Sequence, residues 1–363
     1  MEGKMKAIQY FGKGDLRLVE KDIPAIGPKD VLLKSKLVSI CGSDMHPYIS
    51  GPKWAAVPDE IPGHEFCATV AEVGSEVKNY KVGDRVIGFN AGVCGECWYC
   101  RNGQYDKCSH GTKNYTGRGL PGAGAQYFKF SDAENPNSMF GYLNTLMLVP
   151  EDISDQQICL AEPFGVGLMA VQVSQVKAGD TVVILGTGII GNSAMQFAKA
   201  RGAKVIMVGR SKRRLDCAKA CGADYVIDNS YGDMYRQIAE ITGEVGWQFG
   251  PETADVDITI DCAGYPNSFG DALKLTKNGG TVCEVAFHTQ DSLVNPQYLV
   301  SKGLNIRTVN FNDLHGALNA FREGTAKVEP LIDDIVPLSR FIEAYERQAA
   351  GTAVKVLIDM QAE

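Results

Sequence analysis

The sequence has little excess charge of either sign and no extended basic block or stripe. Its 363 residues include 36 Lys and Arg against 43 Asp and Glu, which gives a formal net charge of −7. Proteins that bind nucleic acids usually carry a basic patch or stripe, so this composition argues against a nucleic-acid partner. No apolar run approaches the roughly 20 residues that a membrane-spanning helix requires, and we therefore expect no membrane partner.

A secretory signal and internal repeats are also missing from the sequence. Without an export signal, the eleven cysteines are expected to be reduced thiols in the cytoplasm rather than disulfides. The length exceeds what a single hydrophobic core usually supports, so we expect two domains.

Four of the cysteines lie together in one loop, at Cys94, Cys97, Cys100 and Cys108. Short spacings of this kind place thiolates around a tetrahedral zinc ion. Four protein ligands leave no position for water, so this zinc would be structural and take no part in catalysis. An iron–sulfur cluster or four unrelated cysteines is the alternative.

The first part of the chain is predicted to be rich in β-structure. Short apolar segments bounded by Gly, Pro or Asp predict strands at residues 5–10, 16–19, 31–38, 66–73 and 82–87. Strands this short, with frequent glycines, favour a partly open barrel from which the cysteine loop projects. The polar residues 131–146 are predicted to form a long surface loop.

From residue 163 onward the pattern changes to strands that alternate with helices. A helix is predicted at 165–176, and strands at 181–185, 204–208, 225–227, 258–261 and 280–284. This alternation is typical of a parallel, doubly wound α/β sheet. A strand at 305–310, two helical segments and a strand at 354–359 are expected to return to the first domain. The predicted domains are therefore 1–163 with 303–363, and 164–302.

A glycine-rich turn, Gly186-Thr187-Gly188-Ile189-Ile190-Gly191, lies between a predicted strand and a predicted helix. In this context Gly186 would make the tight turn, Gly188 would let the backbone approach a pyrophosphate, and Gly191 would allow close packing of helix and strand. The helix N-terminus would offer N–H groups and its dipole to the phosphates. The turn therefore predicts a dinucleotide coenzyme.

The second strand of this domain lacks the acidic residue that usually binds the ribose 2′-hydroxyl of NAD. In its place is Gly209, followed by Arg210, Ser211 and three basic residues that end at Arg214. Without a carboxylate there is no repulsion against a 2′-phosphate, and Arg210 could form a forked pair with it. The sequence favours NADP and leaves NAD possible. The basic residues could also be solvated charges at a helix start.

A second set of candidate metal ligands precedes and follows the cysteine loop, at Cys41, His64, Glu65 and Glu162. Thiolate, imidazole and carboxylate suit a catalytic zinc ion that has three protein ligands and one open position. Each residue alone has a plain structural explanation, as a buried thiol, a core histidine or a charge at a helix N-terminus. Their occurrence beside a cysteine lobe and a nucleotide-binding turn favours the catalytic interpretation.

Taken together, these motifs resemble the zinc-containing medium-chain dehydrogenases/reductases, and most closely the sorbitol, threonine and butanediol dehydrogenase branch. The resemblance runs almost end to end. Besides the cysteine lobe and the glycine turn, it is carried by Cys-Gly-Ser-Asp-x-His at 41–46, Pro-Gly-His-Glu at 62–65, Val-Gly-Asp-Arg-Val at 82–86 and Glu-Pro at 162–163. It implies a GroES-like catalytic domain and a Rossmann domain.

The resemblance also implies a role for each candidate residue. Cys41 and His64 would bind the catalytic zinc, and Glu65 or Glu162 would complete its shell. The remaining assignments lie on one short segment: Asp44 would orient His64, Ser43 would contact the substrate oxygen, and His46 would relay the proton.

The implied reaction is hydride transfer between NAD(P) and a polyol, sugar or other secondary alcohol, by way of a zinc-bound alkoxide. A reductase of simple ketones or aldehydes and an amino-alcohol dehydrogenase remain alternatives. A zinc-free quinone or enone reductase would lack the cysteine lobe, and a non-catalytic nucleotide-sensing homologue would have lost a ligand or the relay hydroxyl. Because the family includes dimers and tetramers, a homo-oligomer is expected.

Overall fold

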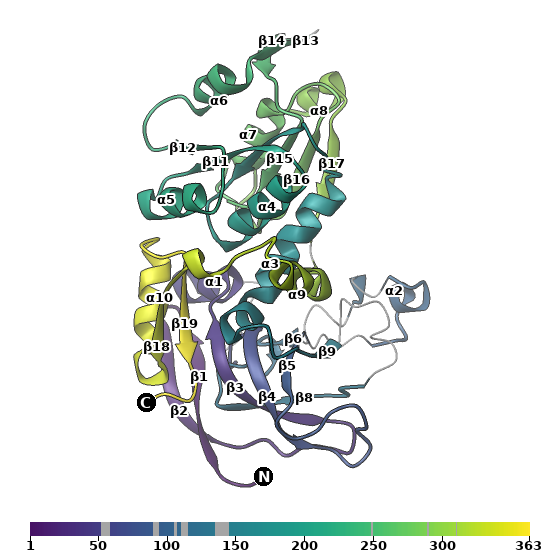
Figure 1. Ribbon diagram of the computed structural model, residues 1–363, viewed down its shortest axis with the longest axis vertical. Helices are drawn as coiled ribbons and strands as arrows, with labels where there is room; N and C mark the ends of the chain where they lie inside the picture. The colour runs from purple at the N-terminus through teal and green to yellow at the C-terminus, as the bar shows by residue number, and fades with distance from the viewer. Residues whose placement is uncertain are drawn as a thin grey trace. The chain divides into compact units, whose positions relative to one another are not determined.

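The chain forms two compact units, Met1–Glu162 with Ile332–Glu363, and Pro163–Leu331. The computed structural model describes residues 1–51, 59–89, 94–104, 107–109, 115–134, 145–247, 250–288, 290–309 and 311–363. Each unit has its own sheet, as Figure 1 shows, and its own hydrophobic core. The expected division into a β-rich unit and an α/β unit is confirmed.

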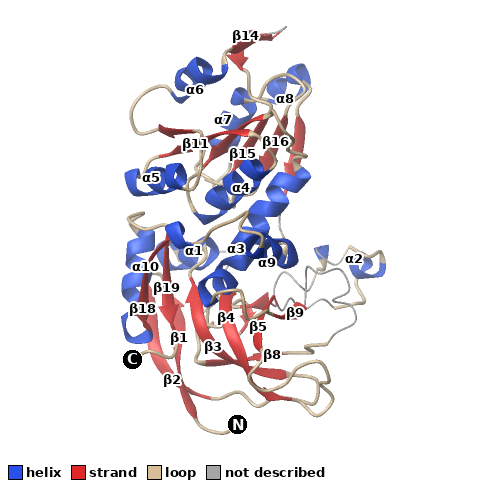
Figure 2. Cartoon of the chain, viewed as in Figure 1, coloured by secondary structure: helices blue, strands red, loops and turns tan. Residues whose placement is uncertain are grey.

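A seven-stranded sheet dominates the first unit. Six of its strands lie in the order β18-β19-β3-β4-β5-β9, and the seventh, β8, also pairs with β3. Its strands are β3 (Val31–Ser39), β4 (Glu65–Val73), β5 (Arg85–Phe89), β8 (Tyr127–Phe130), β9 (Thr145–Leu148), β18 (Ile332–Pro337) and β19 (Lys355–Asp359). A hairpin of β1 (Lys4–Gly12) and β2 (Asp15–Asp22) and a small pair of β6 (Tyr115–Thr116) and β7 (Gly119–Leu120) complete the strands described in this unit (Figure 2).

The described helices of the first unit are short. They are α1 (Gly42–Ser50), α2 (Trp98–Arg101) and α10 (Phe341–Ala349), with the 3₁₀ turn η5 (Leu338–Arg340). Helices α1 and α10 pack together through Tyr48 and Tyr345, whose ring centroids lie 5.6 Å apart. Helix α10 also packs on β19, so the C-terminal segment contributes to the same core as α1.

The second unit contains a six-stranded parallel sheet in the order β12-β11-β10-β15-β16-β17. Its strands are β10 (Thr181–Leu185), β11 (Lys204–Gly209), β12 (Tyr225–Asp228), β15 (Ile258–Asp261), β16 (Thr281–Glu284) and β17 (Asn305–Thr308). The helices are α4 (Ile189–Ala200), α5 (Lys212–Ala220), α6 (Met234–Thr242), α7 (Ser268–Leu275), α8 (Pro296–Lys302) and α9 (Leu314–Arg322), followed by η4 (Glu329–Leu331). The strand order reverses between β10 and β15, which confirms the doubly wound fold.

The predicted return to the first unit at residue 303 is wrong. Strand β17 pairs in parallel with β16 and forms the edge of the second sheet. The segment that follows also stays in this unit, because the Phe321 ring of α9 packs on Phe164 with centroids 5.1 Å apart. Gln196 of α4 donates to the Lys327 carbonyl oxygen at 3.0 Å. The chain therefore leaves the second unit only after Leu331.

The predicted helix at 165–176 starts earlier than expected. Helix α3 spans Asp155–Val173 and contains Pro163. Its start is marked by Ser154, whose hydroxyl accepts from the Gln157 N–H at 3.2 Å while the Gln157 amide oxygen accepts from the Ser154 N–H at 2.9 Å. This reciprocal pair is a capping box. As a result Glu162 lies within a helix and not in a linker.

Residues 242–254 and the predicted surface loop 131–146 differ in how far the structure describes them. Residues 242–254 form a hairpin of β13 (Glu244–Trp247) and β14 (Gly250–Ala254) on either side of 248–249, which lie outside the described residues. In the predicted loop 131–146, residues 135–144 lie outside the described residues, and strand β9 begins at Thr145.

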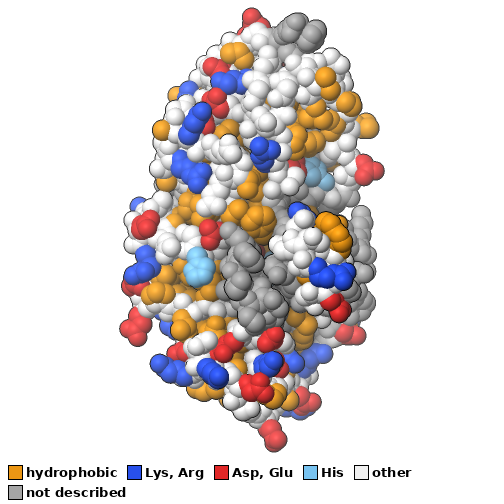
Figure 3. Space-filling view, turned by 90° about the vertical axis from the view of Figure 1, so that its right-hand side faces the viewer, with side chains coloured by type: hydrophobic (Ala, Val, Ile, Leu, Met, Phe, Trp, Pro, Cys, Tyr) orange, Lys and Arg blue, Asp and Glu red, His pale blue; other side chains and the backbone are white. Residues whose placement is uncertain are grey.

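The surface in Figure 3 carries charges of both signs. Among the described residues on that face, acidic and basic side chains are interspersed. None of the helices in the described parts of the chain is both long enough and apolar enough to span a bilayer.

Candidate active site

Two neighbouring strand ends bring Cys41, His64 and Glu65 together. Strands β3 and β4 are antiparallel, and Ser39 at the end of β3 is opposite Glu65 at the start of β4. Cys41 follows β3 as the N-cap residue of α1, and His64 immediately precedes β4. One ligand atom from each of the three residues lies within 4.8 Å of the other two. Thiolate, imidazole and carboxylate form a donor set that fits zinc.

Asp44 lies next to His64, as the sequence suggested. Its Oδ1 is 3.9 Å from His64 Nδ1, and its Oδ2 accepts a hydrogen bond from the Cys41 N–H at 3.1 Å. The side chains of His64 and Asp44 are only 7% and 6% exposed. Asp44 thus lies between the start of α1, to which it is hydrogen-bonded, and the imidazole, with which it is in ion-pair contact.

The charges around His64 favour a cation at this site. Burial alone would lower the pKa of His64, but the charges of Cys41, Asp44 and Glu162 outweigh burial and raise it to about 10. Burial raises the pKa of Asp44. Without a metal ion, the pocket therefore holds a proton on His64, and a zinc ion would have to displace that proton.

Glu65 is fixed by a lysine from the far end of the sequence. Lys355 Nζ lies 2.5 Å from Glu65 Oε2 and 2.5 Å from the Ile40 carbonyl oxygen. Burial raises the pKa of Glu65, but the Lys355 and His64 charges outweigh it and lower that pKa. Glu162 is buried nearby on α3, and its charge acts on His64, but it is outside the set within 4.8 Å. Of the two glutamates that the sequence left open, Glu65 is the one in the ligand set.

The relay candidates Ser43 and His46 lie on α1, three residues apart. This spacing places them on the same side of the helix. Arg118 lies beside them and donates from Nη2 to the Ser43 carbonyl oxygen at 3.4 Å. Burial, followed by the charge of Arg118, lowers the pKa of the half-buried His46 imidazole. The imidazole is therefore neutral near pH 7 and able to accept a proton.

Sequence reasoning missed three residues at this site: Lys355, Tyr115 and Arg118. The Tyr115 ring lies edge-on to His64 with centroids 6.0 Å apart, and it stacks on Phe89 at 5.3 Å. Arg118 lies over the Tyr115 ring, 5.1 Å from its centroid. A signal was present only for Lys355, which is a charged residue in the otherwise apolar segment 353–358. Nothing in the local sequence marks the other two.

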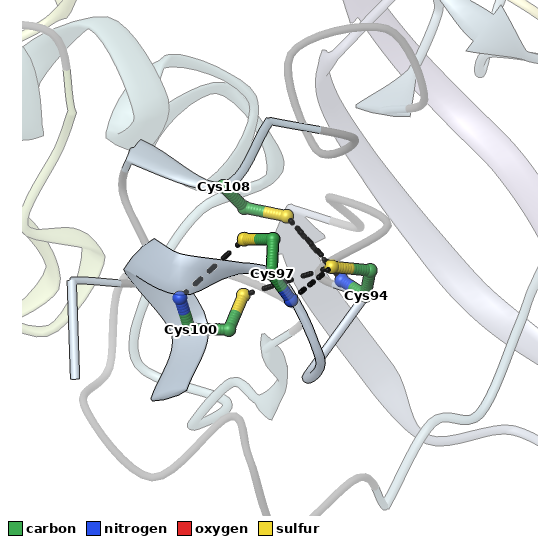
Figure 4. Close-up of side chains that lie close together, drawn as sticks. All are labelled: Cys94, Cys97, Cys100 and Cys108. Atoms are coloured by element: carbon green, nitrogen blue, oxygen red, sulfur yellow. Dashed lines mark hydrogen bonds between the residues drawn. The ribbon is translucent and has the colours of Figure 1, made fainter. Parts of the chain in front are cut away.

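Cys94, Cys97, Cys100 and Cys108 converge as predicted (Figure 4). Cys94 Sγ lies 3.6 Å from Cys108 Sγ and 3.9 Å from Cys100 Sγ. Zinc–sulfur bonds of about 2.3 Å place tetrahedral sulfurs about 3.8 Å apart, so the spacing fits one zinc ion. The Cys100 N–H lies 3.5 Å from Cys97 Sγ and is the largest cause that lowers the pKa of Cys97, to about 5.

The three glycines of the nucleotide-binding turn serve distinct purposes in the second unit. Gly186 has φ +99°, and a Cβ on Gly191 would lie 2.0 Å from the Gly186 carbonyl oxygen. A side chain at Gly191 would therefore force α4 away from β10. In contrast, a Cβ on Gly188 would meet nothing within 4 Å. The open space at the N-terminus of α4 is where a pyrophosphate would bind.

Asn192 is a further residue of this turn that the sequence did not reveal. Its side-chain amide donates to the Thr187 and Gly188 carbonyl oxygens at 2.9 and 3.0 Å. The side chain is fully buried. Asn192 thus holds the turn from within α4.

The Thr187 side chain lies against Gly209, the last residue of β11. A Cβ on Gly209 would lie 2.5 Å from Thr187 Oγ1, so the threonine in the glycine turn occupies the space of a side chain there. Arg210 is exposed, and its guanidinium lies over the Tyr265 ring at 5.5 Å.

The other basic residues of this segment differ in their contacts. Ser211 is the N-cap residue of α5, and Arg214 is half-buried in its first turn. Lys212 pairs with Asp216 at 2.5 Å, and Arg213 donates to the Pro330 carbonyl oxygen at 3.4 Å. Some of these charges therefore serve α5 and its neighbours, as the alternative interpretation expected.

Comparison with known proteins supports the same conclusion for both units. Residues 27–136 match the alcohol dehydrogenase GroES-like domain, and residues 190–328 match the zinc-binding dehydrogenase family. The sorbitol dehydrogenase of Halalkalibacterium halodurans is 29% identical, over 98% of this chain and 99% of its own.

Two solved structures share the fold over nearly the whole chain. An Escherichia coli alcohol dehydrogenase in complex with NADH has a TM-score of 0.83 and 26% identity, over 98% of this chain and 99% of its own. A zinc-binding dehydrogenase from Sinorhizobium meliloti bound to NADP has the same TM-score, 27% identity and the same coverage. With both family matches, these likenesses show that the chain is an oxidoreductase of the zinc-containing medium-chain dehydrogenase/reductase family, in the branch of the sorbitol and threonine dehydrogenases.

Proposed function

We propose that this protein is a zinc-dependent dehydrogenase that oxidises a polyol, a sugar or another secondary alcohol, with NADP as the preferred coenzyme. The observation that carries the proposal is the set of Cys41, His64 and Glu65 ligand atoms within 4.8 Å of one another. A second zinc ion would be held by the cysteine lobe and support structure only.

The bound groups would supply the reactivity. Zinc in the Cys41 site would act as a Lewis acid toward the substrate oxygen, and the nicotinamide would accept or donate the hydride. This chain's residues would prepare the site for them. Asp44 would hold the His64 ring, and Lys355 would keep Glu65 ionised and in place.

Proton transfer would involve the two relay candidates on α1. The Ser43 hydroxyl would hydrogen-bond the substrate oxygen and take up its proton. His46, whose pKa is lowered by burial, would be neutral at pH 7 and could carry the proton outward. Arg118 beside them would disfavour a permanent positive charge on His46 and so promote release.

The preference for NADP rests on Gly209 and Arg210. Gly209 carries no carboxylate that would repel a 2′-phosphate, and the Thr187 side chain occupies the space beside it. Arg210 is exposed at the end of β11, where it could form a forked pair with that phosphate. Ser211 and Arg214 would contribute further contacts at the start of α5.

The substrate class follows from the relatives. The sorbitol dehydrogenase noted above is similar over nearly the entire chain, which supports a polyol or sugar over a simple alcohol. We further propose a homodimer or homotetramer in the cytoplasm, with no nucleic-acid or membrane partner. None of the eleven cysteines, all of which lie among the described residues, forms a disulfide, as a reducing compartment favours.

The test combines metal analysis with activity. We expect two zinc ions per chain and turnover of at least one member of a polyol and secondary-alcohol panel. Cys41→Ala should remove one zinc and lower kcat/KM by more than roughly a hundredfold, because one metal ligand is lost. Cys221→Ala, which changes another half-buried thiol, is the matched control and should leave both unchanged. Full activity in Cys41→Ala would contradict the proposed metal site.

Coenzyme preference is tested separately. Arg210→Ala should raise the KM for NADP by roughly tenfold to a hundredfold and leave the KM for NAD unchanged, because a charge-assisted hydrogen bond is lost only with NADP. Lys212→Ala, which breaks an exposed ion pair with Asp216, is the control. Equal effects of Arg210→Ala on both coenzymes would contradict the role of Arg210.

A further inference from the structure

A third cluster of potential metal ligands belongs to the second unit, whereas the residues of both predicted zinc sites belong to the first. Asp261 and Glu284 are the last residues of the neighbouring parallel strands β15 and β16, and they are paired in register. His288 follows in the next loop. Its Nε2 lies 3.2 Å from Glu284 Oε1 and 3.7 Å from Asp261 Oδ2. All three ligand atoms lie within 4.8 Å of one another.

Two carboxylate oxygens of this cluster are buried without a hydrogen-bond partner. Asp261 has a fully buried side chain. Its Oδ1 accepts from the Ala263 and Gly264 N–H groups at 2.8 and 3.3 Å, while its Oδ2 accepts no hydrogen bond. Glu284 Oε2 is likewise buried and unpartnered. Leaving such groups unsatisfied destabilises the folded state, and more so when they are charged. A ligand that both carboxylates can bind would remove this cost.

The contacts of Ser292 bear on which ring nitrogen of His288 carries the proton and which one presents a free electron pair to the carboxylates. The Ser292 hydroxyl donates to the Pro266 carbonyl oxygen at 2.9 Å, so its proton is not available to His288. At 3.4 Å from Nδ1, the hydroxyl oxygen can therefore only accept from an Nδ1–H. In the neutral imidazole, that tautomer leaves Nε2 without a proton. With Nε2 unprotonated, its 3.2 Å contact with Glu284 Oε1 requires either a proton on the glutamate or a metal cation between the two groups.

We propose that Asp261, Glu284 and His288 bind a divalent cation of the zinc and manganese class. Bonds of about 2.1 Å to nitrogen and oxygen in a tetrahedral site separate the ligand atoms by about 3.4 Å. The observed 3.2 and 3.7 Å lie on either side of that value. The cation would neutralise the two buried carboxylates and keep a fourth position for water. Ser292 would orient the imidazole from its other nitrogen.

A shared proton is the competing occupant of the cluster. Burial, followed by the charge of Asp261, raises the pKa of Glu284 to about 8. In a metal-free protein at neutral pH, Glu284 would therefore hold a proton. A proton neutralises the charge of one of the two carboxylates, whereas a divalent cation neutralises both. A metal-binding measurement therefore distinguishes the two occupants.

The experiment uses the full-length, zinc-loaded protein and Mn²⁺ as the probe. Thiolate-rich sites retain zinc against Mn²⁺, whereas carboxylate and imidazole ligands accept it. Zinc is counted by elemental analysis, and Mn²⁺ binding is followed through loss of the free-ion EPR signal. If the site is empty in the purified protein, wild type should bind one Mn²⁺ per chain. If zinc already fills the site, wild type should instead contain one zinc ion per chain more than the variants. Glu284→Gln and His288→Gln should each lose that ion.

The matched control is His315→Gln, which alters an exposed histidine of α9 in the same unit. It should retain the extra ion. Circular dichroism establishes that each variant is folded, and His288→Gln, in a loop, provides a test even if Glu284→Gln does not fold. The proposal is overturned if wild type binds no ion beyond the two predicted zincs, since a shared proton then explains the cluster. It is also overturned if both variants keep the extra ion.

Discussion

At the scale of single residues, the most consequential contact is the buried pair of Lys355 and Glu65. Their side chains are 2% and 1% exposed, and Lys355 also donates to the Ile40 carbonyl oxygen. A buried ion pair is expensive to form, but the loss of one member leaves an uncompensated charge. This pair therefore links the ligand set to the C-terminal strand β19.

We expect Lys355→Met to lower the free energy of unfolding by about 3–5 kcal/mol, because Glu65 is then buried without a partner. The double variant Lys355→Met/Glu65→Gln should lose less than Lys355→Met alone. Lys129→Met, which removes a surface lysine paired with Asp30 at 3.7 Å, should change stability by at most about 1 kcal/mol. Denaturant titration of wild type, these three variants and Glu65→Gln measures these differences. A double variant as unstable as the sum of its parts would refute the coupling.

The depressed pKa of His46 has a consequence for acid stability. Because burial lowers this pKa below 6.5, the folded protein binds fewer protons than the unfolded chain at mildly acidic pH. Stability from this residue is therefore present above pH 6.5 and lost as pH falls through the folded-state pKa. We expect the free energy of unfolding to fall less steeply below pH 6.5 in His46→Gln than in wild type. Parallel pH curves for the two proteins would show that His46 does not contribute.

At the scale of elements, the turn between β10 and α4 depends on close backbone approach. Gly191 packs against the Gly186 carbonyl oxygen, and Thr187 fills the space beside Gly209. Asn192 holds the same turn through two carbonyl oxygens. The absence of an acid at Gly209, the last residue of β11, is therefore matched by the Thr187 side chain in the neighbouring turn, so the two positions are sterically coupled.

Substituting the glycines of this turn should separate packing from coenzyme binding. Gly191→Ala places a Cβ 2.0 Å from a carbonyl oxygen and should lower the free energy of unfolding by about 1–3 kcal/mol or more, because the core is overpacked. Gly188→Ala has open space and should leave stability within about 1 kcal/mol while weakening coenzyme binding. Thermal melts and coenzyme titration measure the two effects. Equal destabilisation by both would contradict the assignment.

At the scale of the whole molecule, the chain folds as two units with a discontinuous first unit. Strand β17 completes the edge of the second sheet, and α9 with η4 packs on the same unit. The segment 303–331 therefore belongs to the core that the predicted boundary would have cut.

A fragment that contains residues 163–331 should fold alone and unfold cooperatively, because it retains all six strands and α9. The fragment 164–302 lacks β17, which leaves the edge of β16 unpaired and the Phe164 ring uncovered. Exposed strand edges and apolar surface favour association, so this shorter fragment should aggregate. Size-exclusion chromatography and thermal denaturation compare the two. Equal solubility and stability would show that the contacts after residue 302 are dispensable.

The sequence alone determined the features that depend on neighbouring residues. The spacing of Cys94, Cys97 and Cys100 and the turn at Gly186 rely on local backbone geometry, and the structure has both where the sequence indicated. The alternation of strands and helices was equally readable, because periodicity is a local property. The early start of α3 is also marked in the sequence, by Ser154 and Gln157, but the apolar run that follows favours a later start.

Only the tertiary structure decided which distant residues meet. Lys355 reaches Glu65 across 290 positions because β19 pairs with β3 in one register, and a shift of one residue would turn its side chain to the other face. Asp261 joins Glu284 and His288 because β15 and β16 are neighbours in the sheet. The assignment of β17 to the second unit likewise depends on tertiary structure, because β17 pairs with the strand β16 of that sheet. Strand order and register arise from packing of the entire core, and local sequence does not encode them.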